Sequence, residues 1–83
     1  MEIRYAEKAA DHLRRLPREA QRRIAEKMRF YASERNPLKF AERLTDPAEG
    51  DFRFRVGAYR VIFDVRHHII FVLAIRKRNE GTY

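Results

Sequence analysis

Hydrophobic positions change their spacing along the chain, from helical in the first half to alternating in the second. Residues 1–5 alternate apolar and charged side chains, which predicts a short edge strand. Over residues 6–16 and again over 20–31, apolar side chains recur every three or four positions, as in amphipathic helices. Pro17 separates the two stretches and Asn36-Pro37 closes the second, so we expect an α-hairpin.

From residue 51 onward the pattern has a period of two, which indicates strands. Gly57-Ala58 fits a two-residue hairpin turn, Arg66-His67 fits a second turn, and the apolar run 69–75 is typical of a central strand. Residues 38–50 carry turn signals and are expected to be irregular. The pattern predicts an α+β fold: a short N-terminal edge strand, an α-hairpin, and a three-stranded antiparallel meander. The helices should cover the face that holds these apolar side chains: Phe52, Phe54, Val56, Tyr59, Val61, Phe63 and Val65.

Length and composition set the class of protein. The chain has 83 residues, 45% of them hydrophobic, which suits one small domain over residues 1–83. It contains no cysteine, so neither a disulfide nor a thiolate metal site is available. No apolar run is long enough to span a membrane and the first residues do not resemble a signal peptide, so we expect a cytoplasmic protein.

The charge balance points to a polyanionic partner. Nineteen Lys and Arg against 12 Asp and Glu give a formal net charge of +7. Four of the 19 are lysines, which leaves 15 arginines. Arginine presents a planar set of donors that matches phosphate, so nucleic acid is the favoured partner.

Three arginines are expected on the sheet face that points away from the core. Arg53, Arg55 and Arg60 occupy its positions, and the hairpin turn would set Arg55 directly opposite Arg60. Like charges across a strand pair are destabilising, and Asp64 is the only acid predicted on that face. A sequence that breaks a local rule in this way indicates a functional site, and RNA phosphates would supply the missing counter-charge.

A basic cluster, Arg76-Lys77-Arg78, follows the last strand, and Tyr83 ends the sequence. The cluster can be read as an ordinary basic surface tail. Alternatively, Arg78 reaches the edge of the sheet face that carries the three arginines, and Tyr83 stacks on an unpaired base, as aromatic side chains do in RNA-binding proteins.

These motifs together resemble the RelE/ParE toxin superfamily. The resemblance lies in Phe-Arg-Phe-Arg-Val at 52–56, Gly-Ala-Tyr-Arg-Val-Ile-Phe at 57–63, Ile-Arg-Lys-Arg at 75–78 and the closing Tyr83. It implies a type II toxin. The RelE branch cuts messenger RNA in the ribosomal A site without a metal or cofactor, whereas the ParE branch poisons DNA gyrase.

The resemblance also implies roles for individual residues. Arg53, Arg55, Arg60 and Arg78 match basic positions of the RelE branch, and Tyr83 matches its C-terminal tyrosine, so these five are the expected catalytic residues. The RelE branch usually has lysine at positions 53 and 55. Arginine cannot lose its proton near neutral pH, so the general base stays open between Tyr83 and Glu80.

Three functions follow from this reading. The leading one is a ribosome-dependent endoribonuclease that leaves a 2′,3′-cyclic phosphate and a 5′-hydroxyl. The second is a gyrase-directed toxin, and the third is a basic module that binds an acidic partner without catalysis. Either toxin implies an acidic antitoxin, and the first also implies the ribosome and messenger RNA as partners. We expect His12 to be an ordinary exposed residue of the first helix.

Overall fold

The computed structural model describes residues 1–45 and 48–77. It confirms the predicted α+β class and the expected order of the helices and long strands. Within the described residues the elements are β1 (Glu2–Tyr5), α1 (Glu7–Arg14), α2 (Arg18–Ser33), a short 3-10 helix η1 (Pro37–Phe40), β2 (Glu42–Arg43), β3 (Phe52–Val56), β4 (Tyr59–Arg66) and β5 (Ile69–Lys77).

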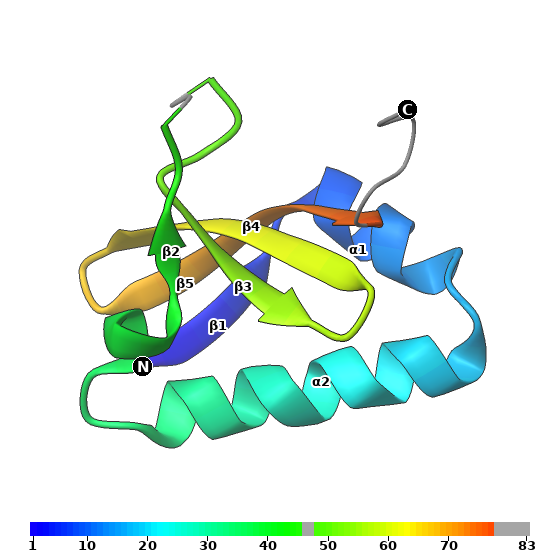
Figure 1. Ribbon diagram of the computed structural model, residues 1–83, viewed down its shortest axis with the longest axis horizontal. Coiled ribbons are helices and arrows are strands. Elements are labelled where there is room, and N and C mark those ends of the chain that lie inside the picture. Colours follow the sequence, from blue (N-terminus) through cyan, green and yellow to red (C-terminus); the bar gives the residue numbers. More distant parts are fainter. Residues whose placement is uncertain (46–47, 78–83) are drawn as a thin grey trace.

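The strands form one mixed sheet in the order β1-β5-β4-β3-β2 (Figure 1). The predicted meander of β3, β4 and β5 is antiparallel, and β1 lies parallel to β5 at one edge. The expectation that residues 38–50 are irregular was wrong, because they contain η1 and β2. β2 is too short for any periodicity to show in the sequence. It pairs with β3 and sets Glu42 opposite Arg53.

The first hairpin turn has the predicted register. Gly57 and Ala58 connect β3 to β4, and Gly57 adopts a φ of 58°, a conformation that glycine enters without a steric cost. This two-residue connection places Arg55 directly opposite Arg60, as expected from the sequence.

The second turn lies one residue later than predicted. His67 and His68 form it, with φ angles of 52° and 62°, and Arg66 is instead the last residue of β4. Histidine enters the left-handed region more readily than most side chains, which accounts for a tight turn without glycine. The turn pairs Arg66 with Ile69.

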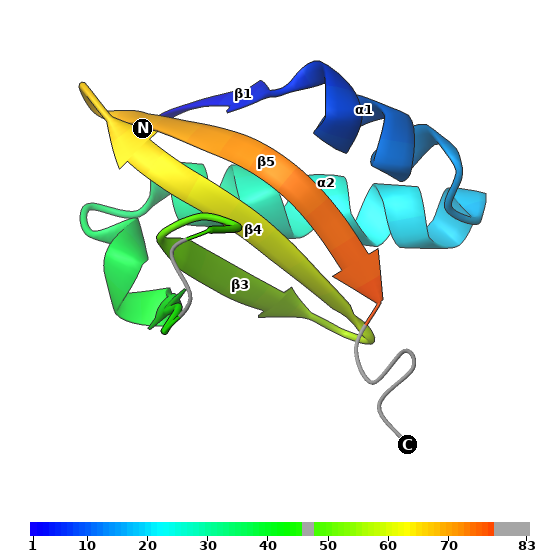
Figure 2. The same cartoon turned by 90° about the horizontal axis from the view of Figure 1, so that it is seen from above.

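The helices cover one face of the sheet and one of its edges. α2 lies across the inner face (Figure 1), and α1 continues from β1 along the edge of β5 (Figure 2). Ile24, Met28 and Tyr31 of α2 are buried against the sheet, and the rings of Tyr31, Phe54 and Phe63 form a stack with centroids 3.9 and 4.2 Å apart. Full burial of a large apolar side chain stabilises a fold by about 1.5–3 kcal/mol, so this stack holds α2 on the sheet.

The segment before β3 crosses part of the outer face. A Cβ at Gly50 would lie 2.8 Å from Cγ2 of Ile62 and 3.1 Å from Cδ1 of Leu73, so the backbone packs directly on these two side chains. The N–H of Asp51 donates to Oδ1 of Asp64 at 2.8 Å. These contacts explain why Ile62 is buried although it points away from the helices.

Within residues 1–45 and 48–77, no helix combines the length and the apolar composition needed to cross a bilayer.

Candidate functional site

A row of arginines crosses the outer face of the sheet. Arg55 of β3 pairs with Arg60 of β4, and Arg60 pairs in turn with Arg76 of β5. Arg53 lies two residues before Arg55 and therefore on the same face. The structure thus places Arg53, Arg55 and Arg60 together, as the sequence predicted, and adds Arg76 to them. We call these four side chains the arginine face.

A carboxylate from β2 reaches two of these arginines. Oε1 of Glu42 accepts hydrogen bonds from Nε of Arg53 at 2.8 Å and from Nε of Arg55 at 2.9 Å. These two hydrogen bonds lower the pKa of the Glu42 carboxyl from its ordinary value, because they favour the ionised form. Asp64 was predicted to be the only acid on this face. That prediction was wrong, because β2 and the segment after it bring further carboxylates there.

The other end of the row is also paired. Nε of Arg76 donates to Oε1 of Glu49 at 2.5 Å. Arg60 lies between the two pairs and is half-buried. Across residues 1–45 and 48–77, no ion pair involves Arg60. The positive charge of Arg60 is therefore the least compensated in the row, at the point where two arginines flank it.

The remaining two predicted site residues, Arg78 and Tyr83, lie outside the described residues. Lys77 is the last described residue of β5.

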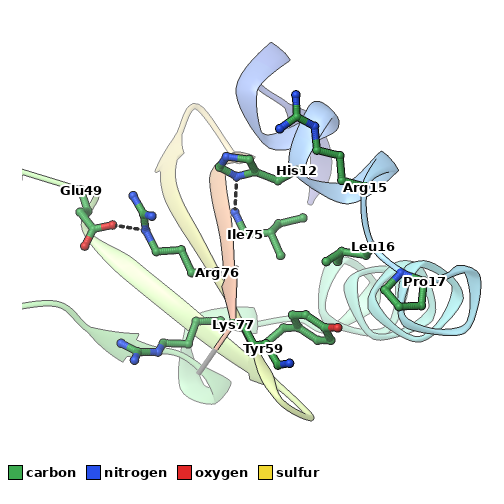
Figure 3. Close-up of a pocket in the computed structure, with 10 residues that line it drawn as sticks. His12, Arg15, Leu16, Pro17, Glu49, Tyr59, Ile75, Arg76 and Lys77 are labelled. Carbon is green, nitrogen blue, oxygen red and sulfur yellow. Dashed lines mark hydrogen bonds and ion pairs between the residues drawn. The ribbon is translucent and has the colours of Figure 1, made fainter. Parts of the chain in front are cut away.

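A cleft of about 980 Å³ opens beside the arginine face, where α1 ends and where β4 begins and β5 ends (Figure 3). Its charged lining comprises Arg15, Glu49, Arg60, Arg76 and Lys77. The rest of the lining comprises His12, Leu16, Pro17, Tyr59 and Ile75. The cleft and the arginine face share Arg60 and Arg76, so the two form one continuous basic surface.

His12 is part of this surface, contrary to the expectation from the sequence. We expected an exposed residue of ordinary kind, but His12 is half-buried and its Nδ1 accepts a hydrogen bond from the N–H of Ile75 at 3.1 Å (Figure 3). The two residues are 63 positions apart, so no local pattern reveals the contact. One signal was available: His12 follows Ala9 by three positions and precedes Leu16 by four, which places it beside the apolar stripe of the helix.

The chemistry of the site follows from these positions. Several fixed guanidinium groups can bind a phosphate, and the ionised carboxylate of Glu42 beside them can accept a proton close to it. Glu42 takes the Nε–H of Arg53 and of Arg55, so a phosphate can bind the remaining guanidinium donors or replace Glu42 as the acceptor at Nε.

Comparisons with known proteins agree with the fold. Residues 3–81 match the family model described as the ParE toxin of the type II toxin–antitoxin system parDE. Comparison with curated protein sequences gives no significant match.

Two solved structures are similar over almost the whole chain. One is the RelBE2 toxin–antitoxin complex from Mycobacterium tuberculosis, with a TM-score of 0.77, 25% identity, and coverage of 93% of this chain and 96% of that one. The other is the archaeal RelE–RelB complex from Pyrococcus horikoshii, with a TM-score of 0.75, 26% identity, and coverage of 96% and 97%. The chain is therefore a type II toxin that belongs to the ParE toxin family, within the RelE/ParE superfamily.

Proposed function

We propose that this toxin cuts messenger RNA in the ribosome, and that the cut takes place on the arginine face. The observation that carries the proposal is the binding of Glu42 by Arg53 and Arg55, with Arg60 opposite Arg55 on the neighbouring strand, because it combines phosphate-binding cations with a proton acceptor. A surface that only needed solubility would not align like charges across neighbouring strands.

The proposed reaction is a transesterification. The ribose 2′-oxygen attacks the adjacent phosphorus, the bond to the 5′-oxygen breaks, and the products are a 2′,3′-cyclic phosphate and a 5′-hydroxyl. The attacking hydroxyl loses a proton and the leaving oxygen gains one. In the transition state, negative charge builds on the non-bridging oxygens of the phosphate. Fixed guanidinium groups stabilise such charge by several kcal/mol.

Glu42 is the proposed general base. Its pKa is lowered by Arg53 and Arg55, so the carboxylate is ionised near neutral pH and ready to accept a proton. An RNA phosphate that replaces Glu42 at Arg53 and Arg55 would remove the hydrogen bonds that lower the basicity of the carboxylate. The 2′-hydroxyl of the same nucleotide would then lie close to Glu42. Phosphate binding would in this way activate the base, a role that arginine itself cannot fill.

Arg78 and Tyr83 keep the roles that the resemblance implies, as proposals. Arg78 would act near the leaving 5′-oxygen, and Tyr83 would stack on an unpaired base.

The two solved complexes support the ribonuclease reading, because each contains a Rel-type toxin. A second function has its own support, because the matching family model is that of the ParE toxin. In this alternative the toxin inhibits DNA gyrase, and its arginines contact protein or DNA without cutting.

Both alternatives imply an acidic antitoxin. Both solved structures are toxin–antitoxin complexes. Arg60 has no ion pair among the residues that the structure describes, so it offers a contact for an acidic segment. Because such a partner binds only the folded toxin, the complex should unfold at a higher temperature than the free chain.

One experiment separates the two functions. The purified chain is added to ribosomes programmed with a defined message and, in parallel, to gyrase with relaxed plasmid. Cleavage at the A-site codon with unaffected supercoiling supports the proposal. Blocked supercoiling with an intact message supports the gyrase alternative.

A further inference from the structure

The cleft beside the arginine face has the composition of a nucleotide site. We propose that it binds one nucleoside monophosphate unit, with the phosphate on its cations and the base on its apolar wall, and that His12 holds that unit in position. The inference rests on the proposed function, because Arg60 and Arg76 belong both to the cleft and to the arginine face.

The apolar wall suits a nucleobase. Leu16, Pro17, Ile75 and the half-buried ring of Tyr59 line the cleft, and in Figure 3 the ring of Tyr59 extends toward Leu16 and Pro17. Flat apolar and aromatic surfaces hold unpaired bases by stacking. A volume of about 980 Å³ is sufficient for a nucleotide, since small-molecule sites typically span roughly 300–1,000 Å³.

The charges of the cleft locate the phosphate. Arg15 is paired with Asp11 at 3.1 Å and Arg76 with Glu49 at 2.5 Å. Arg60 and Lys77 line the same cleft, and the part of the chain that the structure describes gives neither of them an ion pair. A phosphate bound between these two cations would supply the missing counter-charge.

The hydrogen bond to Ile75 fixes the His12 ring and its tautomer. Nδ1 can accept the N–H of Ile75 only when it carries no proton, so in the neutral ring the proton is on Nε2. The ring lines the cleft, and its Nε2–H is therefore a donor of defined direction for an acceptor atom of the bound nucleotide.

This hydrogen bond also has a structural role that any test must separate from binding. β1 ends at Tyr5, which pairs with Val72, so α1 rather than a strand lies beside the rest of β5. On the side of β5 that faces α1, the backbone N–H of Ile75 donates its hydrogen bond to His12 instead of to a neighbouring strand. The variant His12→Asn separates the two roles, because the side-chain oxygen of asparagine can accept the Ile75 N–H while the Nε2 donor is lost.

The test measures binding of two probes to the full chain by calorimetry. One probe is a single-stranded RNA tetranucleotide with 2′-O-methyl riboses, which cannot be cut by attack of the 2′-oxygen, and the other is free 3′-AMP. His12→Asn should leave the unfolding temperature unchanged and raise Kd up to about tenfold, the effect of one lost hydrogen bond. The matched control is His68→Asn, in the turn at the opposite end of β5, which should bind as the wild type does.

Lys77→Met provides a second, independent variant. It keeps most of the side-chain stem and removes the charge, so it should weaken binding and reduce the slope of log K against log salt by about 0.7, the value for one phosphate contact on a single strand. Tighter binding of the tetranucleotide than of 3′-AMP identifies an RNA strand as the ligand. Equal binding identifies a free nucleotide.

The inference is overturned if His12→Asn and Lys77→Met both bind as the wild type does, because His12 would then only support β5. Its failure is distinct from that of the proposed function. If the wild-type chain binds the tetranucleotide through His12 but never cuts a message, the nucleotide site is supported and the ribonuclease function is overturned. If the doubly substituted chain cuts normally, the ribonuclease function is supported and the nucleotide site is overturned.

Discussion

Arg55 and Arg60 lie directly opposite each other on β3 and β4, on the sheet face that the helices do not cover. Arg76 extends this row onto β5, and among residues 1–45 and 48–77 carboxylates bind only its two ends, through Glu42 and Glu49. Three aligned guanidinium groups oppose folding by mutual repulsion. This arrangement supports the proposal that the row is a binding site for an anion.

Arg60→Ala should slow message cleavage strongly while leaving the fold intact or slightly more stable. The substitution removes the central cation, which costs about 10²- to 10³-fold in rate by analogy with the loss of one charge-stabilising donor, and it also relieves repulsion in the row. Single-turnover cleavage on programmed ribosomes and urea denaturation measure the two effects.

Arg66→Ala is the control for this substitution, because Arg66 is an exposed arginine at the far end of the same strand. It should cut at close to the wild-type rate. Equal losses in the two variants would mean that total charge, and not the position of Arg60, determines activity.

Glu42→Gln should separate binding from cleavage. Glutamine cannot accept the 2′ proton, and the loss of one negative charge leaves Arg53 and Arg55 more attractive to phosphate. We therefore expect tighter binding of a non-cleavable RNA together with a cleavage rate at least about 10²-fold lower. Glu26→Gln, which removes the same charge from α2, should change neither, and unimpaired cleavage by Glu42→Gln would exclude Glu42 as the base.

The stability difference between the wild type and Glu42→Gln should depend on pH. The folded-state pKa of Glu42 lies below its ordinary value of 4.5. The ionised carboxylate therefore stabilises the fold at pH values above 4.5, and this stabilisation is lost as the pH falls through the folded-state pKa. Unfolding temperatures of the two proteins should therefore differ at pH 7 and converge in acid. A difference that stays constant down to pH 3 would show that the hydrogen bonds to Arg53 and Arg55 contribute no stability.

Gly50→Ala should destabilise the chain far more than Gly57→Ala. At Gly50 the added carbon would overlap Ile62 at 2.8 Å and the backbone has a φ of +155°, so we expect a loss of about 3 kcal/mol or more. At Gly57 the nearest atom is the Arg23 guanidinium at 3.5 Å, and the φ of +58° alone costs about 1 kcal/mol. Urea denaturation measures both, and similar losses would mean that the Gly50 segment does not pack on the sheet as described.

The alternating pattern allowed the sheet and its two faces to be predicted. A period of two separates Phe54 and Phe63 from Arg53 and Arg55, and the two-residue turn at Gly57 fixes the pairing of Arg55 with Arg60. Each of these relationships depends on residues that are close together in the sequence.

The features that could not be predicted depend on contacts between distant residues. Glu42 lies in a strand of two residues, and only its pairing with β3 places its carboxylate on the arginines. The contact between His12 and Ile75 joins residues that are 63 positions apart in the sequence. The turn at His67 and His68 has no glycine or asparagine to mark it, which is why it was predicted one residue early.

The most direct test of the central claim is the chemistry of the cut. A message is placed in the ribosomal A site with a natural ribose at the cleavage position, and a second message carries a single 2′-deoxy substitution there. We expect fragments with a 2′,3′-cyclic phosphate and a 5′-hydroxyl from the first message, and none from the second. Cleavage of the 2′-deoxy message, or an intact natural message under conditions in which the chain blocks gyrase, would contradict it.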